Sequence, residues 1–176
     1  MKLNSILAVA VLVLSLNGAQ ASDEWRAGGS LSNFTYNTAT NGGWGLSINA
    51  DWGHALSTNL QLIGLLGLGY NSSTVAGVTG TNIPYSIMAG LRYNFGDKIQ
   101  ESMFLQAAVG IGGSSTSAAG STTSTSGMGW DVGIGNRYKI ADAVSYVPQV
   151  GVNSVGATGT TVTNIYAKLV NFAIWF

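Results

Sequence analysis

The chain has 176 residues, of which only 8% are charged, and its seven basic and seven acidic residues give a net charge of zero. A soluble globular domain carries about 25% charged residues, so this composition argues against one, and the balanced charge gives no reason to propose a nucleic-acid partner. The absence of cysteine and the single histidine exclude a disulfide framework and a histidine-based metal site, and no cofactor is expected.

The first 21 residues are expected to be an export signal. Lys2 gives a positive start, residues 6–16 form an apolar stretch, and Ala19-Gln20-Ala21 is a small-residue cleavage site. The stretch is shorter than the roughly 20 residues that a membrane-spanning helix needs. An uncleaved anchor is the alternative, but neither a stop-transfer stretch nor a basic flank follows. We expect a signal peptide at 1–21, cleaved after Ala21, and one mature domain at 22–176.

Eight later segments are expected to be β-strands. In chain order they are residues 25–31, 44–52, 60–70, 84–95, 103–112, 128–135, 146–153 and 166–176. In 44–52 and 84–95 every second residue is apolar or aromatic and the residues between are small or polar, which indicates a strand with one apolar face. In 60–70 both faces are apolar, but three glycines disfavour a helix. The strand at 146–153 contains Pro148, which cannot donate a ladder hydrogen bond.

The connections between these strands alternate between short and long. Short turns are expected at residues 55–58, 96–101 and 141–143, and longer connections rich in Ser, Thr, Gly and Asn at 37–42, 71–82, 113–127 and 154–161. This alternation is typical of an up-and-down transmembrane barrel whose short turns face the periplasm. The tract from Ser114 to Ser126 is uncharged and of low complexity, so it is interpreted as a mobile or disordered surface loop, with adhesion as the alternative role.

The strand faces predict a closed barrel in a membrane. Their apolar faces suit lipid outside and their small or polar faces suit the interior, whereas a soluble sandwich would invert this preference. Lipid cannot satisfy backbone hydrogen bonds, so the sheet must close. The predicted fold class is therefore all-β, an eight-stranded antiparallel up-and-down transmembrane β-barrel. At that strand number side chains fill the lumen, so a water-filled diffusion channel is not expected.

Strand parity predicts a set of charged side chains inside this lumen. The inward-facing set is Asp51, Arg92, Asp131 and Arg137, joined by Glu24 and Arg26 if Trp25 faces lipid. A selectivity ring carries mainly one sign of charge, so this mixed set favours a plug over a pore. Asp51, Arg92 and Arg137 are expected in one layer, with Asp131 higher. Lys168 has the parity of a lipid-facing residue and is expected to snorkel to the outer headgroups.

Aromatic residues gather toward the expected strand ends, where they predict girdles at the two membrane interfaces rather than a ligand-stacking site. The interface set is Trp25, Trp44, Trp52, Tyr70, Tyr93, Trp130, Tyr138 and Trp175.

The end of the chain resembles the closing strand of bacterial outer-membrane barrels. Val170, Phe172, Ile174 and Phe176 form an apolar series at every second residue and finish on a terminal aromatic. The segment Gly90 to Phe95 is also similar to strands of small OmpA-type and opacity-type barrels. The resemblance covers the mature chain and implies the outer membrane of a Gram-negative bacterium. It further implies membrane lipid and lipopolysaccharide as surroundings, and Phe176 as the residue that the assembly machinery recognises.

Three functions are compatible with this resemblance. The leading hypothesis is a non-enzymatic barrel with a filled lumen that anchors short surface loops, for envelope structure or surface contact, the surface ligand being unknown. The first alternative is a narrow pore for ions or small solutes. The second is a lipid A-modifying enzyme, because some eight-stranded barrels are lipid A deacylases or acyltransferases. It is disfavoured because His54 lies at a periplasmic turn, where Ser57 has no neighbouring carboxylate except Asp51.

Overall fold

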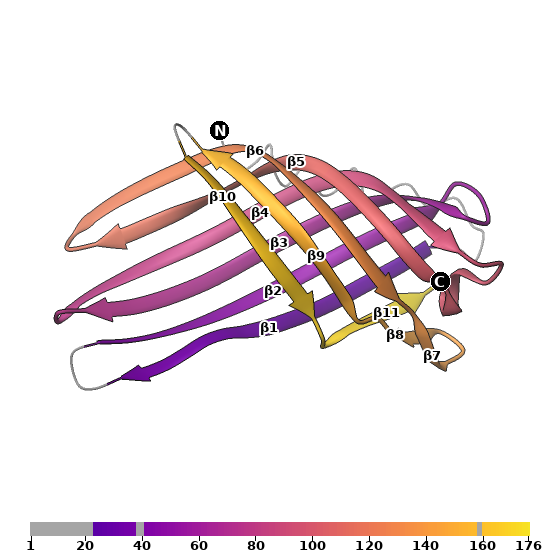
Figure 1. Cartoon of the computed structure of the whole chain (residues 1–176), viewed down its shortest axis with the longest axis horizontal. Coiled ribbons are helices and arrows are strands. Elements are labelled where there is room, and N and C mark those ends of the chain that lie inside the picture. The colour runs from indigo at the N-terminus through magenta and orange to yellow at the C-terminus, as the bar shows by residue number, and fades with distance from the viewer. Residues whose placement is uncertain (1–22, 38–40, 158–159) are drawn as a thin grey trace.

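The computed structural model describes residues 23–37, 41–157 and 160–176, without the side chains of residues 29–42 and 157–160, so the expected signal peptide lies outside the described part. Apart from one short 3-10 turn, η1 (Ile99–Glu101), the regular elements in that part are β-strands (Figure 1). The strands are β1 (Asp23–Asn37), β2 (Asn41–Ala55), β3 (Leu60–Val75), β4 (Val78–Phe95), β5 (Met103–Ala118), β6 (Ser121–Asn136), β7 (Tyr138–Ala141), β8 (Val144–Tyr146), β9 (Gln149–Ala157), β10 (Thr160–Lys168) and β11 (Asn171–Trp175).

These strand elements correspond to eight passes of the chain. β7 continues β6 after the single residue Arg137, and β8 leads into β9 across Val147 and Pro148. The latter break falls at the proline, which has no backbone N–H to donate. In the same way β10 leads into β11 across residues 169–170. The eight-stranded antiparallel up-and-down barrel predicted from the alternation is confirmed.

The last strand closes the barrel at the end that carries the short turns, whereas β10 pairs only with β9 among the described strands and leaves an unpaired edge beside β1, which the sequence did not predict. Neighbouring passes pair antiparallel from β1 to β6, followed by β9 and β10, while β11 pairs with both β1 and β8. Its register with β1 runs from Glu24 opposite Trp175 to Gly28 opposite Asn171. Closure by this strand lies at the end of the barrel that carries the short turns, which we call the turn end (Figure 1).

The opposite end, which we call the hairpin end, differs from the prediction. β3 and β4 continue to Val75 and Val78, and β5 and β6 to Ala118 and Ser121, joined by two-residue turns. Ala76 and Gly77 have φ of 51° and 78°, and Ala119 and Gly120 have 49° and 80°, as two-residue hairpins with positive φ at both central positions require. The Ser/Thr tract is thus a paired hairpin, and its interpretation as a mobile or disordered loop was wrong. A segment rich in serine and threonine has the composition of a loop, but threonine also has a high propensity for β-strands.

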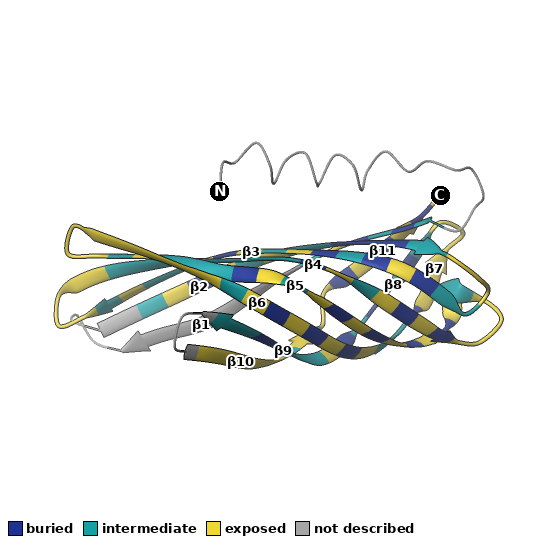
Figure 2. Ribbon diagram, turned by 90° about the horizontal axis from the view of Figure 1, so that it is seen from above, coloured by how far each residue is buried: buried dark blue, intermediate teal, exposed yellow. Residues whose placement is uncertain are grey.

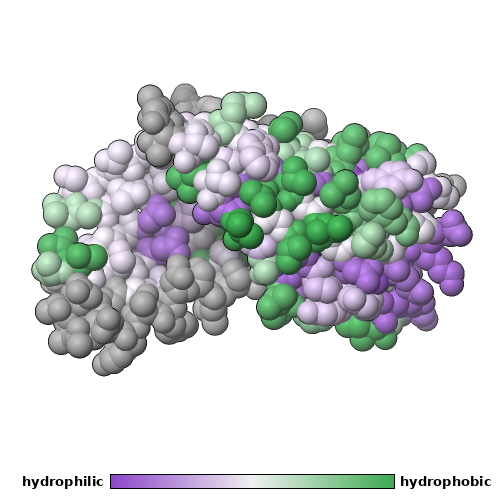
Figure 3. All heavy atoms as spheres, viewed as in Figure 1, coloured by the Kyte–Doolittle hydropathy of each residue, from purple (hydrophilic) through white to green (hydrophobic). Residues whose placement is uncertain are grey.

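Burial alternates along the strands (Figure 2), and many of the exposed positions carry apolar side chains. Exposed residues of the outer face include Leu46, Ile48, Leu66, Leu68, Leu91, Leu105, Val109, Val132, Ile134 and Val150. Figure 3 shows hydrophobic side chains grouped over the part of the barrel next to the turn end. This is the band that lipid requires on the outer face of a barrel. The outermost residues of the turn end itself are hydrophilic. No helix among the described residues is long and apolar enough to span a membrane.

The alternation slips by one residue in the last pass. Lys168 is partly buried and faces the lumen, whereas Leu169 and Val170 are both exposed. Inward positions therefore change from even numbers in β10 to odd numbers in β11, because the two elements are separated by an irregular step. The prediction that Lys168 faces lipid was wrong for this reason. Trp175 is likewise 6% exposed and packs against Phe104, so its prediction as an interface aromatic was also wrong.

Candidate functional site in the lumen

Six charged side chains are buried in the turn half of the lumen. They are Glu24, Arg26, Asp51, Arg92, Asp131 and Arg137, each at most 6% exposed. Four of them are the residues that strand parity predicted. The other two come from β1, where Glu24 and Arg26 are buried and Trp25 between them is not. We call these six side chains and the amides that join them the plug.

Glu24 is the central acceptor of the plug. Arg137 donates from Nε and Nη2 to the two carboxylate oxygens, both at 2.8 Å, and Arg92 Nη1 donates to Oε2 at 2.8 Å. Arg26 Nε lies 3.9 Å from Oε1. The bidentate contact with Arg137 is the strong geometry for a carboxylate and a guanidinium. Glu24 therefore joins all three arginines.

Asp51 has a different set of neighbours from the one predicted. Its Oδ2 atom lies 2.7 Å from Arg26 Nη2 and 4.0 Å from Arg92 Nη2, and its Oδ1 atom lies 3.8 Å from Lys168 Nζ. Among the described residues no ion pair joins it to Arg137, which Glu24 holds instead. Asp51, Arg92 and Arg137 therefore do not form the single ion-paired layer that was expected. Arg137 binds Glu24, and Arg92 lies between Glu24 and Asp51.

Amide side chains supply most of the remaining hydrogen bonds. Gln106 accepts from Arg26 and Arg92, both at 3.0 Å, and donates to Asp131 at 2.9 Å. Asn94 and Gln61 accept from Arg137 at 2.7 and 3.0 Å. Parity put Gln106 inside, but nothing in the sequence assigned it to the arginines. A network in which most polar groups are paired in this way rigidifies the interior of a protein, although Arg26 Nε donates no hydrogen bond and Asp51 Oδ1 accepts none among the described residues.

Phe104 forms the apolar centre of the plug. It is fully buried, and the guanidinium carbons of Arg26, Arg92 and Arg137 lie 5.0, 5.1 and 4.6 Å from its ring centroid. Guanidinium groups at such distances are attracted to an aromatic face. The sequence analysis did not predict this role of Phe104. The signal that could have indicated it is a large aromatic residue on a strand face whose other residues are small or polar.

Beyond the plug, the hairpin half of the lumen contains a cavity of about 540 Å³. Asp51, Asp131, Tyr166 and Lys168 line it on the plug side. Tyr166 donates to Asp131 Oδ1 at 3.1 Å and accepts from Gln149 at 2.9 Å. On this side the wall of the cavity is therefore formed by two carboxylates of the plug and by side chains that contact them.

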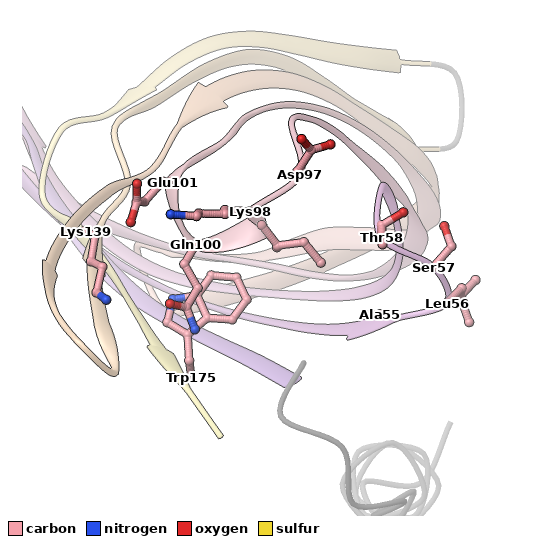
Figure 4. A pocket seen from close by; sticks show the side chains of 11 residues that line it. Ala55, Leu56, Ser57, Thr58, Asp97, Lys98, Gln100, Glu101, Lys139 and Trp175 are labelled. Atoms are coloured by element: carbon pink, nitrogen blue, oxygen red, sulfur yellow. The ribbon is translucent and has the colours of Figure 1, made fainter.

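A second hollow of about 680 Å³ lies on the surface of the turn end (Figure 4). Figure 4 shows that its side chains come from separate turns and strand ends, with Lys98, Glu101 and Lys139 carrying both signs of charge. His54 stands at this end, and its Nδ1 is 2.6 Å from Asp23 Oδ1. Ser57 Oγ instead accepts from the backbone N–H groups of Asn59 and Leu60.

Among the described residues, neither Ser57 nor Asp51 forms a hydrogen bond or an ion pair with His54, whose partner is Asp23. In the same part of the chain, no group of three or more His, Cys, Asp or Glu side chains could hold a metal ion.

Most of the remaining predicted residues are exposed on the outer face, with Trp52 as the buried exception. Trp44 and Tyr70 contact each other with ring centroids 5.1 Å apart, and Tyr93 packs against Phe95 at 5.1 Å. Trp130 and Tyr138 are exposed, whereas Trp52 stacks on His54 and is 8% exposed. The terminal series, Val170, Phe172, Ile174 and Phe176, is exposed along the outside of β11. Its role in assembly stays a prediction.

Comparison with known proteins gives a consistent result. The family described as Outer membrane protein beta-barrel domain matches residues 6–170. Among solved structures, Neisserial surface protein A is 17% identical with a TM-score of 0.63, and the match covers 88% of this chain and 95% of that one. The attachment invasion locus protein Ail of Yersinia pestis is 15% identical (TM-score 0.51, 88% and 95%), and the N-terminal β-barrel domain of Pseudomonas aeruginosa OprF is 12% identical (TM-score 0.55, 89% and 100%). No curated protein sequence matched.

Proposed function

Because this chain belongs to the outer membrane protein beta-barrel family, and is therefore a Gram-negative outer-membrane barrel, we propose that it is a non-enzymatic, plugged barrel. It holds a rigid, hydroxyl-rich sheet at the cell surface for envelope structure or surface contact. In this proposal the turn end faces the periplasm, the hairpin end faces outward, and lipopolysaccharide surrounds the outer half. The assembly machinery recognises the strand that ends at Phe176.

The plug carries the first half of the proposal. Three arginines and three carboxylates fill the turn half; the arginines donate to acceptors such as Glu24 and Gln106, and their guanidinium groups lie over the ring of Phe104. A selectivity ring would carry mainly one sign of charge. A pore for ions or small solutes is therefore the less favoured function.

The hairpins carry the second half. Ser117 and Thr122 are hydrogen-bonded across the β5–β6 hairpin at 2.8 Å, and Ser124 donates to Ser115 at 3.2 Å. β4 pairs with β5 as far as Gly80 opposite Ala118, so the two hairpins form one continuous sheet. Similar barrels carry the names surface protein and attachment invasion locus protein, which agrees with a surface role.

The test is the conductance of the purified, refolded protein in a planar lipid bilayer. The plugged barrel should give no stable single-channel steps, because its lumen is closed by paired charges. A Glu24→Ala variant serves as the matched control, since it removes the acceptor of three arginines and should raise leakage. Regular steps from the unchanged protein would favour the pore. A change in lipid A mass between cells with and without the protein would favour the enzyme.

A further inference from the structure

We propose that the cavity in the hairpin half of the lumen is a binding site for a small, uncharged polyhydroxyl molecule, such as a sugar residue with neighbouring hydroxyl groups. This site is separate from the surface sheet and does not depend on its adhesive role. At about 540 Å³ the cavity lies within the usual 300–1,000 Å³ of small-molecule sites.

Asp51 is the first observation behind this inference. The residue is 3% exposed and lines the cavity; Arg26 Nη2 lies at hydrogen-bonding distance from its Oδ2, whereas its Oδ1 has no hydrogen-bond donor among the described residues. Arg26 and Lys168 lie close enough to balance its charge, at 2.7 and 3.8 Å. A buried carboxylate oxygen without a hydrogen-bond donor is costly, and a hydroxyl group is a donor that would satisfy Asp51 Oδ1 without adding charge.

The walls of the cavity are the second observation. Five asparagines line it: Asn49, Asn71, Asn82, Asn153 and Asn164. An amide both donates and accepts, as a hydroxyl does, so a ring of amides suits a ligand with several hydroxyl groups. Leu65, Met88 and Val155 also line the cavity and form an apolar surface on which the C–H face of a sugar ring can pack.

The charges favour an uncharged ligand. The three arginines of the plug lie over Phe104, and Arg92 and Arg137 are bound to Glu24. They are therefore not displayed for an anion. Lys168 stands beside Asp51 and already offers that carboxylate an ammonium group, so a ligand cation would meet a cation there. What the site lacks is a donor for Asp51 Oδ1, rather than a further charge.

The inference can be tested by calorimetry on the refolded barrel in detergent with glucose, galactose and sucrose as neutral probes. Glucosamine and glucose 6-phosphate are the charged counterparts. At least one neutral sugar should bind saturably and more tightly than its charged counterpart. Binding only of glucosamine, only of the phosphate, or of none of the probes would overturn the proposal.

Variants localise the binding. Asn49→Leu places an apolar side chain in the cavity and leaves the residues of the plug unchanged. The affinity for the sugar should fall about tenfold or more, because the loss of hydrogen bonds to a ligand typically has an effect of this size. Asp51→Asn should do the same, but it also alters the plug, so Asn49→Leu is decisive where the aspartate variant does not fold. Thr122→Val on the outer hairpin is the control and should bind as the unchanged protein does. Unchanged affinity in Asn49→Leu would show that the sugar binds elsewhere.

The natural sugar has two sources, free sugar outside the cell or the glycan of lipopolysaccharide in the same leaflet. The titration repeated in phospholipid vesicles with and without lipopolysaccharide separates them. Weaker apparent binding of the free sugar in the lipopolysaccharide vesicles identifies the lipid glycan as the occupant, and equal binding identifies free sugar.

Discussion

The two halves of the lumen are built by the same alternation of side chains, yet one is filled and the other is hollow. In the turn half, the inward residues are arginine, glutamine and phenylalanine, whose long side chains meet across the barrel axis at Glu24 and Phe104. In the hairpin half they are mainly asparagine, serine and glycine, which do not reach across, and a cavity of about 540 Å³ remains. Side-chain length, rather than strand number alone, decides how much of an eight-stranded lumen is filled.

The halves should also differ in what holds them together. Except for Asp131, the charges of the plug are paired with an opposite charge among the described residues, so removal of one partner leaves the others uncompensated. The polar groups that line the cavity are mainly short and uncharged, so changes there should alter binding more than stability. The predictions below test this difference between a stabilising half and a binding half.

The largest effect is expected from Glu24→Gln, which keeps the size of the side chain but removes the charge that faces three arginines. The loss of one partner from a buried charge network typically costs about 3–5 kcal/mol. The free energy of unfolding, measured in urea by tryptophan fluorescence, should fall by that order.

Asp131→Asn is the matched control for this change. Among the described residues Asp131 has no ion pair, and an asparagine oxygen can still accept from Gln106 and Tyr166. The cost should stay below roughly 1.5 kcal/mol, the net value of an ordinary hydrogen bond. Equal losses in the two variants would show that Glu24 is not the centre of the plug.

A smaller effect is expected from Phe104→Leu, which keeps an apolar side chain but removes the ring that three guanidiniums contact. Desolvated cation–π contacts contribute up to about 2 kcal/mol each, so a total loss of about 2–3 kcal/mol is expected after repacking. Phe95→Leu is the control, because Phe95 faces outward and is half exposed. If both variants lose the same stability, the aromatic face does not bind the arginines.

Much of this molecule could be predicted from its sequence, because a β-strand has a period of two. The parity of Asp51, Arg92, Asp131 and Arg137 placed all four inside, where they are buried. Parity says nothing about which inward residues meet across the barrel, since that depends on the stagger between strands. The central position of Glu24 therefore required coordinates.

Parity also fails wherever the alternation slips. Leu169 and Val170 are consecutive residues that both face outward. Lys168 therefore faces the lumen instead of lipid, and the composition of the segment gave no sign of this slip. The paired Ser/Thr hairpin was missed for a related reason. Its strands have no apolar face, because beyond the lipid neither face needs one, and hydrophobic periodicity is the main signal for a strand.

Gly133→Ala should have a moderate effect at the boundary between the two halves. A Cβ atom at this position would lie 2.6 Å from Gln149 Nε2 and 2.7 Å from the Tyr166 hydroxyl, so Tyr166 would have to move from Asp131. Both atoms are the ends of side chains that can shift, and Tyr166 borders the cavity, so the cost should lie at the low end of the range of about 1–3 kcal/mol that overpacking causes. Gly156→Ala is the control, since its Cβ would meet nothing closer than 3.6 Å. The urea midpoint should fall for Gly133→Ala alone, and equal midpoints would mean that the lumen yields freely there.

The smallest effect is expected on the outer hairpin, where Thr122→Val removes the hydroxyl that contacts Ser117 at 2.8 Å. Both side chains are exposed, so water replaces the lost hydrogen bond, and surface changes of this kind usually alter stability by at most about 0.5 kcal/mol. The urea midpoint should stay constant, while hydrogen exchange of the backbone amides in residues 114–125 should become faster, because the hairpin opens locally. A fall of the midpoint as large as that of Gly133→Ala would mean that hairpin and barrel unfold as one unit. In that case the surface sheet would contribute to the stability of the barrel, instead of being carried by it.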